Sequence, residues 1–423
     1  MSRKRTKDGA RSEVTAWWPF RGRGGRQQRP NEPARSGAIR PVRCLAAMPA
    51  AAAVLVAVMA TAGGAPASAA IVHTGPRAAH AASGQLGAGR GDARQRAVVT
   101  GVSWHELSLL NGWQSSQGTY NSGNPSWAVK GGVVYLSGSL HQPSAGFSEF
   151  AVLPAAARPA HSLVLPVYTV NGTTGDLYIQ PTGQMFVFAS SDAQAYTSLA
   201  GVSFPAATTA VHTLSLLNGW QSSQSVYSNG DPASTVAGGV VYLSGSLDQP
   251  SGTNDEFAVL PAAARPAHTL YLTVYTDADT TGVLKISPNG VMLAYQGNAQ
   301  AFTSLAGVSF PAATTAVHKL SLLNGWQSSQ PAYGTGRPSY TVTGGVVHLS
   351  GSMNQPSGTS TEFAVLPPAA RPTHNLWIKT YTYNGAVGAL EITPSGVMDA
   401  FNSTGNAAQG YTSLAAISYP LGS

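Results

Sequence analysis

One sequence string, L-S-L-L-N-G-W-Q-S-S-Q, occurs three times in this chain. The copies begin at Leu107, Leu214 and Leu320, so they are spaced 107 and 106 residues apart. A fixed period of this length means that one structural unit has been copied, and repeats constrain a fold before local patterns do. The sequence therefore predicts three modules, at residues 98–205, 206–311 and 312–423, with joints short enough for neighbouring modules to touch.

The segment before the repeats has the features of an export leader. Residues 1–70 carry 12 Lys and Arg against three acidic residues, and an uncharged run rich in Ala, Val, Leu and Met begins at Cys44. The run leads into A-P-A-S-A-A, which supplies a small-residue cleavage motif. We expect 1–70 to be a signal peptide region, 71–97 a flexible linker, and the mature protein to be extracellular with no membrane contact. An uncleaved N-terminal anchor is the alternative.

The repeats are sparsely charged. Residues 101–423 hold eight Lys and Arg and 13 Asp and Glu, a net charge of −5 within a chain of net +7. Such a surface lacks the basic footprint that a phosphate backbone requires, so we expect no nucleic-acid partner. The single cysteine, Cys44, lies in the leader, so the mature chain has no disulfide and depends on packed cores.

Each module reads as a succession of short strands. Runs rich in Val, Tyr, Thr and Phe are separated by turn dipeptides such as N-G and G-G, and helical periodicity is absent. We predict an all-β chain of three tandem antiparallel β-sandwiches with a jelly-roll-like strand order. A half-period leaves an alternative open, because prolines recur at intervals of 50–56 residues, which would also suit a six-bladed β-propeller.

The order of motifs in a repeat resembles a known family. In repeat 1 the order is N-G-W, G-G-V-V-Y-L-S-G-S-L, F-A-V-L-P-A-A-A-R-P, G-D-L-Y-I-Q-P-T-G and S-L-A-G-V-S-F. This resembles the C-terminal β-sandwich heads of bacteriophage tail fibres and related receptor-binding proteins. The resemblance implies trimeric heads that bind cell-surface saccharides. The chain departs from the family in its secretion signal and in having no shaft, which favours a secreted bacterial protein that reuses the module.

The recurring tryptophans are the first candidates for a ligand site. An exposed indole can stack on a sugar ring, whereas a tryptophan beside a turn also commonly packs into a sandwich core, and the two interpretations stay open. The glutamine that follows each tryptophan would point to the opposite side of the strand. The candidate binding residues of this group are Trp113, Gln114, Trp220, Gln221, Trp326 and Gln327.

A second group of candidates lies at the L-P-x-x-x-R-P corner. Arg158, Arg265 and Arg371 recur nine residues after a glutamate, so each could bind a saccharide or form a structural contact with that glutamate. The glutamates are Glu149, Glu256 and Glu362. No second acid recurs at a fixed place, so the paired carboxylates of a glycoside hydrolase are not evident.

Histidines also recur in pairs, 56 residues apart within each repeat, but no carboxylate or cysteine recurs beside them to complete a metal site. We interpret them as residues that cap strand edges. The segment from Asp277 to Gly282 lacks the later glutamate of a calcium loop and is interpreted as a turn. We therefore predict no metal and no cofactor.

Sequence differences between repeats concentrate in two loop-like segments per repeat, for example 225–235 and 296–300, which suit either surface contacts or neutral drift. The function predicted is a non-enzymatic, multivalent binding or adhesion protein for surface saccharides or cell wall. The alternatives are a structural or assembly protein with a protein partner, and a glycan hydrolase. We expect either a monomer with pseudo-threefold packing of the repeats or an oligomer.

Overall fold

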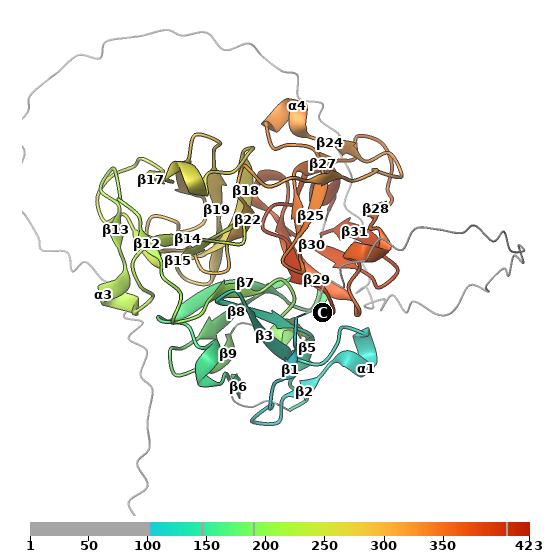
Figure 1. Ribbon diagram of the computed structural model, residues 1–423, viewed down its shortest axis with the longest axis horizontal. Coiled ribbons are helices and arrows are strands. Elements are labelled where there is room, and N and C mark those ends of the chain that lie inside the picture. The colour runs from blue at the N-terminus through green and yellow to red at the C-terminus, as the bar shows by residue number, and fades with distance from the viewer. Residues whose placement is uncertain (1–101, 145–147, 189–190, 403–404) are drawn as a thin grey trace, which may run out of the picture. The chain divides into compact units, whose positions relative to one another are not determined.

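The computed structural model describes residues 102–144, 148–188, 191–402 and 405–423. These residues form antiparallel sheets with only short helices, so the prediction of an all-β fold is confirmed. Figure 1 shows the three repeats as successive groups of strands, from teal through yellow to red. The expected signal peptide region and the whole of the expected linker lie outside the described residues.

The same succession of strands occurs in each repeat, while the described residues of repeat 2 include no counterpart of two short helices of repeat 1, η2 (Val170–Gly172) and α2 (Ser191–Ala195). Repeat 1 contains β1 (His105–Glu106), β2 (Gln114–Ser115), α1 (Gln117–Tyr120), β3 (Ser126–Lys130), β4 (Val133–Ser137), β5 (Ser139–His141), β6 (Glu149–Val152), η1 (Ala155–Ala157), β7 (Leu163–Tyr168), η2 (Val170–Gly172), β8 (Thr174–Ile179), β9 (Gln184–Phe188), α2 (Ser191–Ala195), β10 (Thr197–Ser198) and β11 (Ser203–Pro205). Repeat 2 contains β12 (His212–Thr213), β13 (Gln221–Ser222), α3 (Gln224–Tyr227), β14 (Ala233–Ala237), β15 (Val240–Ser244), β16 (Ser246–Asp248), β17 (Glu256–Val259), η3 (Ala262–Ala264), β18 (Leu270–Thr276), β19 (Thr280–Ile286), β20 (Val291–Tyr295), β21 (Thr303–Ser304) and β22 (Ser309–Pro311). Repeat 3 contains β23 (His318–Lys319), β24 (Gln327–Ser328), α4 (Gln330–Tyr333), β25 (Ser339–Thr343), β26 (Val346–Ser350), β27 (Ser352–Asn354), β28 (Glu362–Val365), η4 (Pro368–Ala370), β29 (Leu376–Tyr381), η5 (Tyr383–Gly385), β30 (Val387–Ile392), β31 (Val397–Phe401), α5 (Ala407–Gly410), β32 (Thr412–Ser413) and β33 (Ser418–Pro420).

Each repeat folds into two facing groups of strands. In repeat 1 the first sheet has the order β1-β3-β4-β11, and the second group comprises β10-β5-β2 and β6-β9-β8-β7, which the bridge between Thr169 and Thr197 joins. In repeat 2 the corresponding strands form one seven-stranded sheet. The first sheet combines the earliest and the latest strands of a repeat, which favours a sandwich over two consecutive four-stranded blades.

One glycine per repeat lets the chain cross between the sheets. Gly138, Gly245 and Gly351 lie between the last residue of the first-sheet strand and the first residue of the next strand, with φ of 84°, 84° and 87°. A Cβ at these positions would lie 2.1–2.4 Å from a backbone oxygen or carbon of the loop before the preceding hairpin. Only glycine satisfies both the left-handed φ and this close approach.

Each repeat buries its own apolar core between its sheets. The core of repeat 1 includes Trp113, Phe150 and Phe204, and the other two repeats bury the corresponding residues. A further buried cluster is shared by all three repeats, because Val133, Val240 and Val346 pack together. The repeats therefore do not fold as independent beads.

The contacts between repeats close a ring. The strands β7, β18 and β29, one from each repeat, contact one another pairwise, as do the pairs β11 with β15, β22 with β26, and β33 with β4. These contacts run from repeat 1 to 2, from 2 to 3, and from 3 back to 1, so the three repeats are related by a pseudo-threefold axis. Aromatic rings add to two of the three seams, with Tyr168 and Trp377 at 5.5 Å and Tyr271 and Tyr381 at 5.9 Å between ring centroids.

One position of the cluster shared by the three repeats holds different residues in different repeats. The Tyr135 and Tyr242 hydroxyls are 2.8 Å apart, whereas the corresponding residue of repeat 3 is His348, which is 2% exposed. Its Nε2 has no hydrogen-bond partner among the described residues. Burial lowers the pKa of His348 to about 4, so the imidazole is neutral at physiological pH.

The fold should therefore lose stability in acid through His348. Between pH 6.5 and about 4 the unfolded chain protonates this histidine while the folded chain does not, so falling pH favours unfolding. Relative to a His348→Gln variant, the wild type should lose up to roughly 3 kcal/mol of unfolding free energy over this range. Urea unfolding at several pH values measures this difference. Other acid-titrating groups occur in both proteins and cancel, so parallel stability curves would contradict the prediction.

Candidate functional site

The structure places the recurring tryptophans inside the sandwiches. Trp113, Trp220 and Trp326 are 3–4% exposed, and each ring lies about 6 Å from a core phenylalanine. The Nε1 atoms of Trp220 and Trp326 donate hydrogen bonds to the backbone oxygens of Asn254 and Ser360. An indole held in this way presents no face to a saccharide, so the arrangement is the core alternative and not the stacking alternative.

The glutamines that follow the tryptophans lie on the surface. Gln114, Gln221 and Gln327 begin β2, β13 and β24, and their side chains are exposed. Strand alternation accounts for this placement, since the neighbouring tryptophan points inward. Each glutamine is on a two-residue edge strand.

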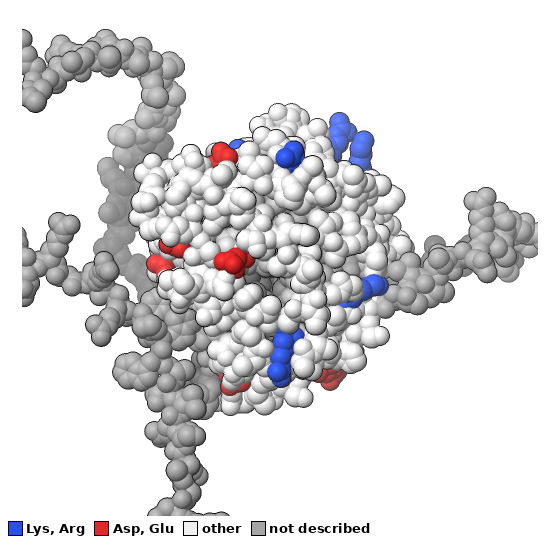
Figure 2. Space-filling view, turned by 60° about the vertical axis from the view of Figure 1, so that its left-hand side comes forward, with Lys and Arg blue, Asp and Glu red and all other residues white. Residues whose placement is uncertain are grey.

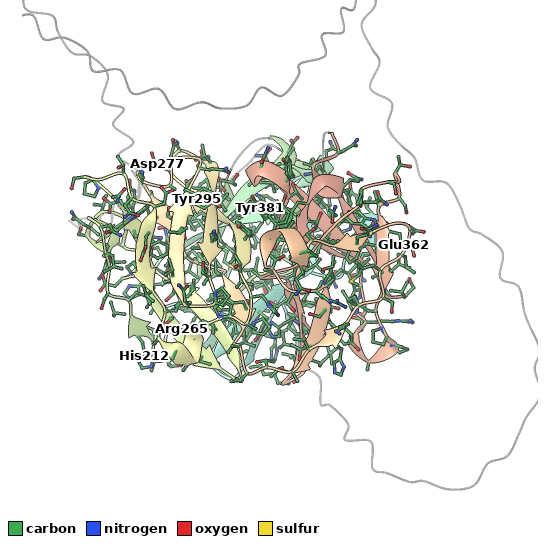
Figure 3. The ribbon with its side chains drawn as sticks, turned by 90° about the horizontal axis from the view of Figure 1, so that it is seen from above. His212, Arg265, Asp277, Tyr295, Glu362 and Tyr381 are labelled. Carbon is green, nitrogen blue, oxygen red and sulfur yellow. The ribbon has the colours of Figure 1, made fainter. Side chains whose placement is uncertain are left out.

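The recurring arginines brace the corner in which they lie. Arg158, Arg265 and Arg371 donate from Nε to a backbone oxygen five residues earlier, at 3.1, 3.0 and 2.9 Å. The prediction that each arginine contacts the preceding glutamate is wrong, because no ion pair joins these residues within the described part of the chain. The physical reason is that the chain turns through η1, η3 and η4, which brings the guanidinium to the carbonyl oxygen of the leucine before each turn. Figure 3 labels one arginine of this set, Arg265 of repeat 2, and one glutamate of the set, Glu362 of repeat 3.

The histidines divide into two groups. The earlier member of each pair lies on an exposed first strand, and His105 stacks on Trp127 at 4.6 Å while His318 stacks on Tyr340 at 5.2 Å. The later member lies at a seam between repeats, where its ring covers a glycine of the next repeat. The pairs are His161 with Gly230, His268 with Gly336, and His374 with Gly123.

Each of these seam histidines lines a pocket, and the three pockets are equivalent. We name them the His161 pocket, between repeats 1 and 2, the His268 pocket, between repeats 2 and 3, and the His374 pocket, between repeats 3 and 1. Their volumes are about 140, 420 and 340 Å³. The sequence alone could not place them, because each is built from residues of two repeats.

A repeated backbone contact builds each seam. The residue after the seam histidine donates its N–H to the left-handed residue that ends a short helix of the next repeat, at 3.0, 3.1 and 2.8 Å. The donors and acceptors are Ser162 with Ser228, Thr269 with Gly334, and Asn375 with Asn121. Because the backbone makes this bond, the side chains nearby are free to vary without loss of the seam.

The polar side chains at the rim do vary. In the His374 pocket, the Asn124 Nδ2 donates to Glu106 Oε1 at 2.8 Å. In the His161 pocket, Asp231 replaces Asn124 and accepts from the Ser222 hydroxyl at 2.7 Å. In the His268 pocket the two corresponding positions hold cations, Lys319 and Arg337. The segments that differ between the repeats in sequence, such as 225–235 and 331–340, are those that form these rims.

Carboxylate pairs in which one member raises the pKa of the other occur in two places among the described residues, both away from these pockets. In one, burial and Asp279 of repeat 2 raise the pKa of Asp176 of repeat 1. In the other, Glu391 on β30 lies opposite Asp399 on β31, and burial together with Asp399 raises the pKa of Glu391 to about 7. Neither residue lines a seam pocket.

Within the described residues, no group of three or more His, Cys, Asp or Glu side chains could hold a metal ion. The Asp277 segment forms the hairpin turn between β18 and β19, as Figure 3 shows at the edge of repeat 2.

Comparisons with known proteins do not place the chain in a family. No protein-family model matches it, and no curated protein matches it. A solved structure described as the crystal structure of BBS1N in complex with ARL6DN, soaked with mercury, aligns at 12% identity over 67% of this chain and 76% of that chain, with a TM-score of 0.12. A likeness of this strength carries no argument about fold or function.

Among the described residues, none of the helices is long and apolar enough to span a bilayer.

Substitutions in the tryptophan–glutamine pair should separate a core role from a surface role. Trp220→Ala should lower the unfolding free energy by about 3–5 kcal/mol, because it removes a buried aromatic ring from a packed core. Gln221→Ala should change it by less than about 0.5 kcal/mol. Urea denaturation monitored by circular dichroism measures both. Equal and small effects would mean that the indole does not pack as described.

Proposed function

We propose that this chain is a secreted, non-enzymatic protein that binds the saccharides of a cell surface or cell wall through its seam pockets. The observation that supports this best is that one backbone framework forms three equivalent pockets while the polar side chains at their rims change. The charge of the rim side chains changes from pocket to pocket, while the backbone bond beneath them is the same at all three seams. Variation on a constant framework is typical of binding surfaces.

The chemistry of the pockets suits polyhydroxylated ligands. All three pockets carry hydroxyl and amide groups in their walls, the His161 and His268 pockets also have buried leucine and phenylalanine side chains, and the His374 pocket has the partly buried Trp104. Hydroxyl and amide groups can hydrogen-bond sugar hydroxyls, and apolar side chains can pack against ring carbons. Figure 2 shows that charged residues are few and scattered over the face in view, so long-range charge attraction is weak. Three sites on one chain would raise the apparent affinity for a repetitive polymer by avidity.

One feature of the sequence supports an extracellular setting, namely the leader-like segment before residue 70, which fits export. The resemblance to phage tail-fibre heads points the same way, since those heads bind surface saccharides as trimers and this chain carries three modules in a ring.

An assembly role is the second candidate, and one observation favours it. Val152, Val259 and Val365 are 42–43% exposed, and they lie on β6, β17 and β28 at the outer edge of the second sheet. An unpaired edge strand with exposed apolar side chains can add a strand from another protein. In that case the three equivalent edges would bind protein partners.

Retention of the purified full-length protein on insoluble polysaccharides and bacterial cell walls tests the saccharide proposal. We expect saturable retention in the wild type. A triple Asn124→Ala, Asp231→Ala, Arg337→Ala variant should bind at least about tenfold more weakly, because each change removes a rim group from one pocket.

A triple Gln114→Ala, Gln221→Ala, Gln327→Ala variant is the matched control, since it removes three exposed amides outside the pockets. Circular dichroism confirms that each variant is folded. Equal retention of the pocket variant and the wild type would contradict the proposal. Self-association or capture of a defined protein partner, without retention on any polymer, would favour assembly.

A further inference from the structure

We propose that the His268 pocket is an anion site that binds the carboxylate or phosphate group of an acidic surface polymer. This inference rests on the proposed function for the polymer, while the anion site itself rests on the geometry of one pocket. Among the three equivalent pockets, this one has the largest volume, about 420 Å³, and carries two cations at its rim.

The two cations are held close together by the backbone. Lys319 on β23 pairs with Ser339 on β25, and the Leu320 N–H donates to the Pro338 oxygen at 2.9 Å. Arg337 directly precedes Pro338, so Lys319 and Arg337 occupy neighbouring positions on adjacent segments. Like charges at such positions repel, and the repulsion has to be offset by solvent or by a bound anion.

The equivalent positions in the other repeats carry no such repulsion. Repeat 1 has Glu106 and Asn124, which hydrogen-bond to each other, and repeat 2 has Thr213 and Asp231. The formal charge at these two positions therefore changes from −1 in repeats 1 and 2 to +2 in repeat 3. Since the framework is shared, the fold does not require cations here.

Arg337 is oriented before any ligand binds. Its Nε donates to the Gln330 Oε1 at 3.3 Å, from the first turn of α4, and the side chain is exposed at the pocket rim. No carboxylate lies within ion-pair distance of Lys319 or Arg337 among the described residues. The two terminal nitrogens of a guanidinium fixed through Nε can bind a carboxylate or phosphate in bidentate geometry.

The rest of the pocket favours an anion that is attached to a ring. Leu270, Phe310 and Leu349 are buried beneath the rim, and hydroxyl groups of Thr335 and Ser339 lie at the wall. The volume is large enough for a sugar ring, and the apolar floor would contact ring carbons while the cations bind the acidic group. A uronate sugar and a sugar-phosphate or polyol-phosphate polymer are the two sources of this chemistry.

Isothermal titration of the full-length protein tests the inference with three probes: galacturonate oligomers, glycerol-phosphate oligomers and neutral cello-oligosaccharides. We expect one site per chain for at least one anionic probe, with affinity that falls as salt rises. A Lys319→Thr, Arg337→Asp variant imports the residues of repeat 2, so it should fold normally and bind that probe at least about tenfold more weakly.

A Lys285→Thr variant is the matched control, because it removes a cation that lies outside the pocket, over the Tyr271 ring. It should bind like the wild type. Preference for galacturonate or for glycerol phosphate identifies the source of the anion. Equal affinity of wild type and the double variant would overturn the inference, as would a lack of preference for anionic probes. Anion binding without retention on polymers would overturn the proposed function and leave the anion site standing.

Discussion

Each repeat presents inner strands that only the other two repeats can cover, and the structure depends on this mutual burial. The strands β7, β18 and β29 meet in pairs around the axis, and Val133, Val240 and Val346 form one cluster with a residue from each repeat. A single module would expose these side chains to water and lose their burial, which contributes about 25 cal/mol per Å² of apolar area. The ring is therefore the folding unit, although each sandwich has its own core.

Placing three modules on one chain removes a constraint that identical subunits obey. In a homotrimer any residue on the axis occurs three times, so a lysine there would bring three cations together. In this chain the equivalent positions hold Pro166, Thr273 and Lys379, around a cavity of about 80 Å³. Burial lowers the pKa of Lys379 to about 7, while the nearby Asp176 of repeat 1 opposes that shift. The Lys379 Nζ donates to the Thr174 hydroxyl, also in repeat 1. A single buried lysine can be accommodated in this way, because burial lowers its pKa and its Nζ has a hydrogen-bond partner.

The same freedom extends to the seams. At each seam, the N–H of the residue after the seam histidine donates to the carbonyl of the left-handed residue that ends a short helix. Because this bond uses backbone atoms alone, it does not depend on the side chains around it. Asn124, Asp231 and Arg337 can then differ in charge at equivalent positions of the three pockets. A chain with three fused modules can present three different sites on one framework, whereas a trimer of identical chains presents one site three times.

The sequence by itself determined the number of modules, their β-rich character and the turns between strands, because repeats, alternation and glycine-rich turns are local signals. The choice between a core role and a ligand-binding role for the three recurring tryptophans needed the structure, since both roles place an indole beside a turn. The tertiary structure alone decided that His161, His268 and His374 line pockets, because each lies on the next repeat's Gly230, Gly336 or Gly123 and no local pattern records that contact. A site built across a seam depends on how modules pack, and packing is set by surfaces that are far apart in the chain.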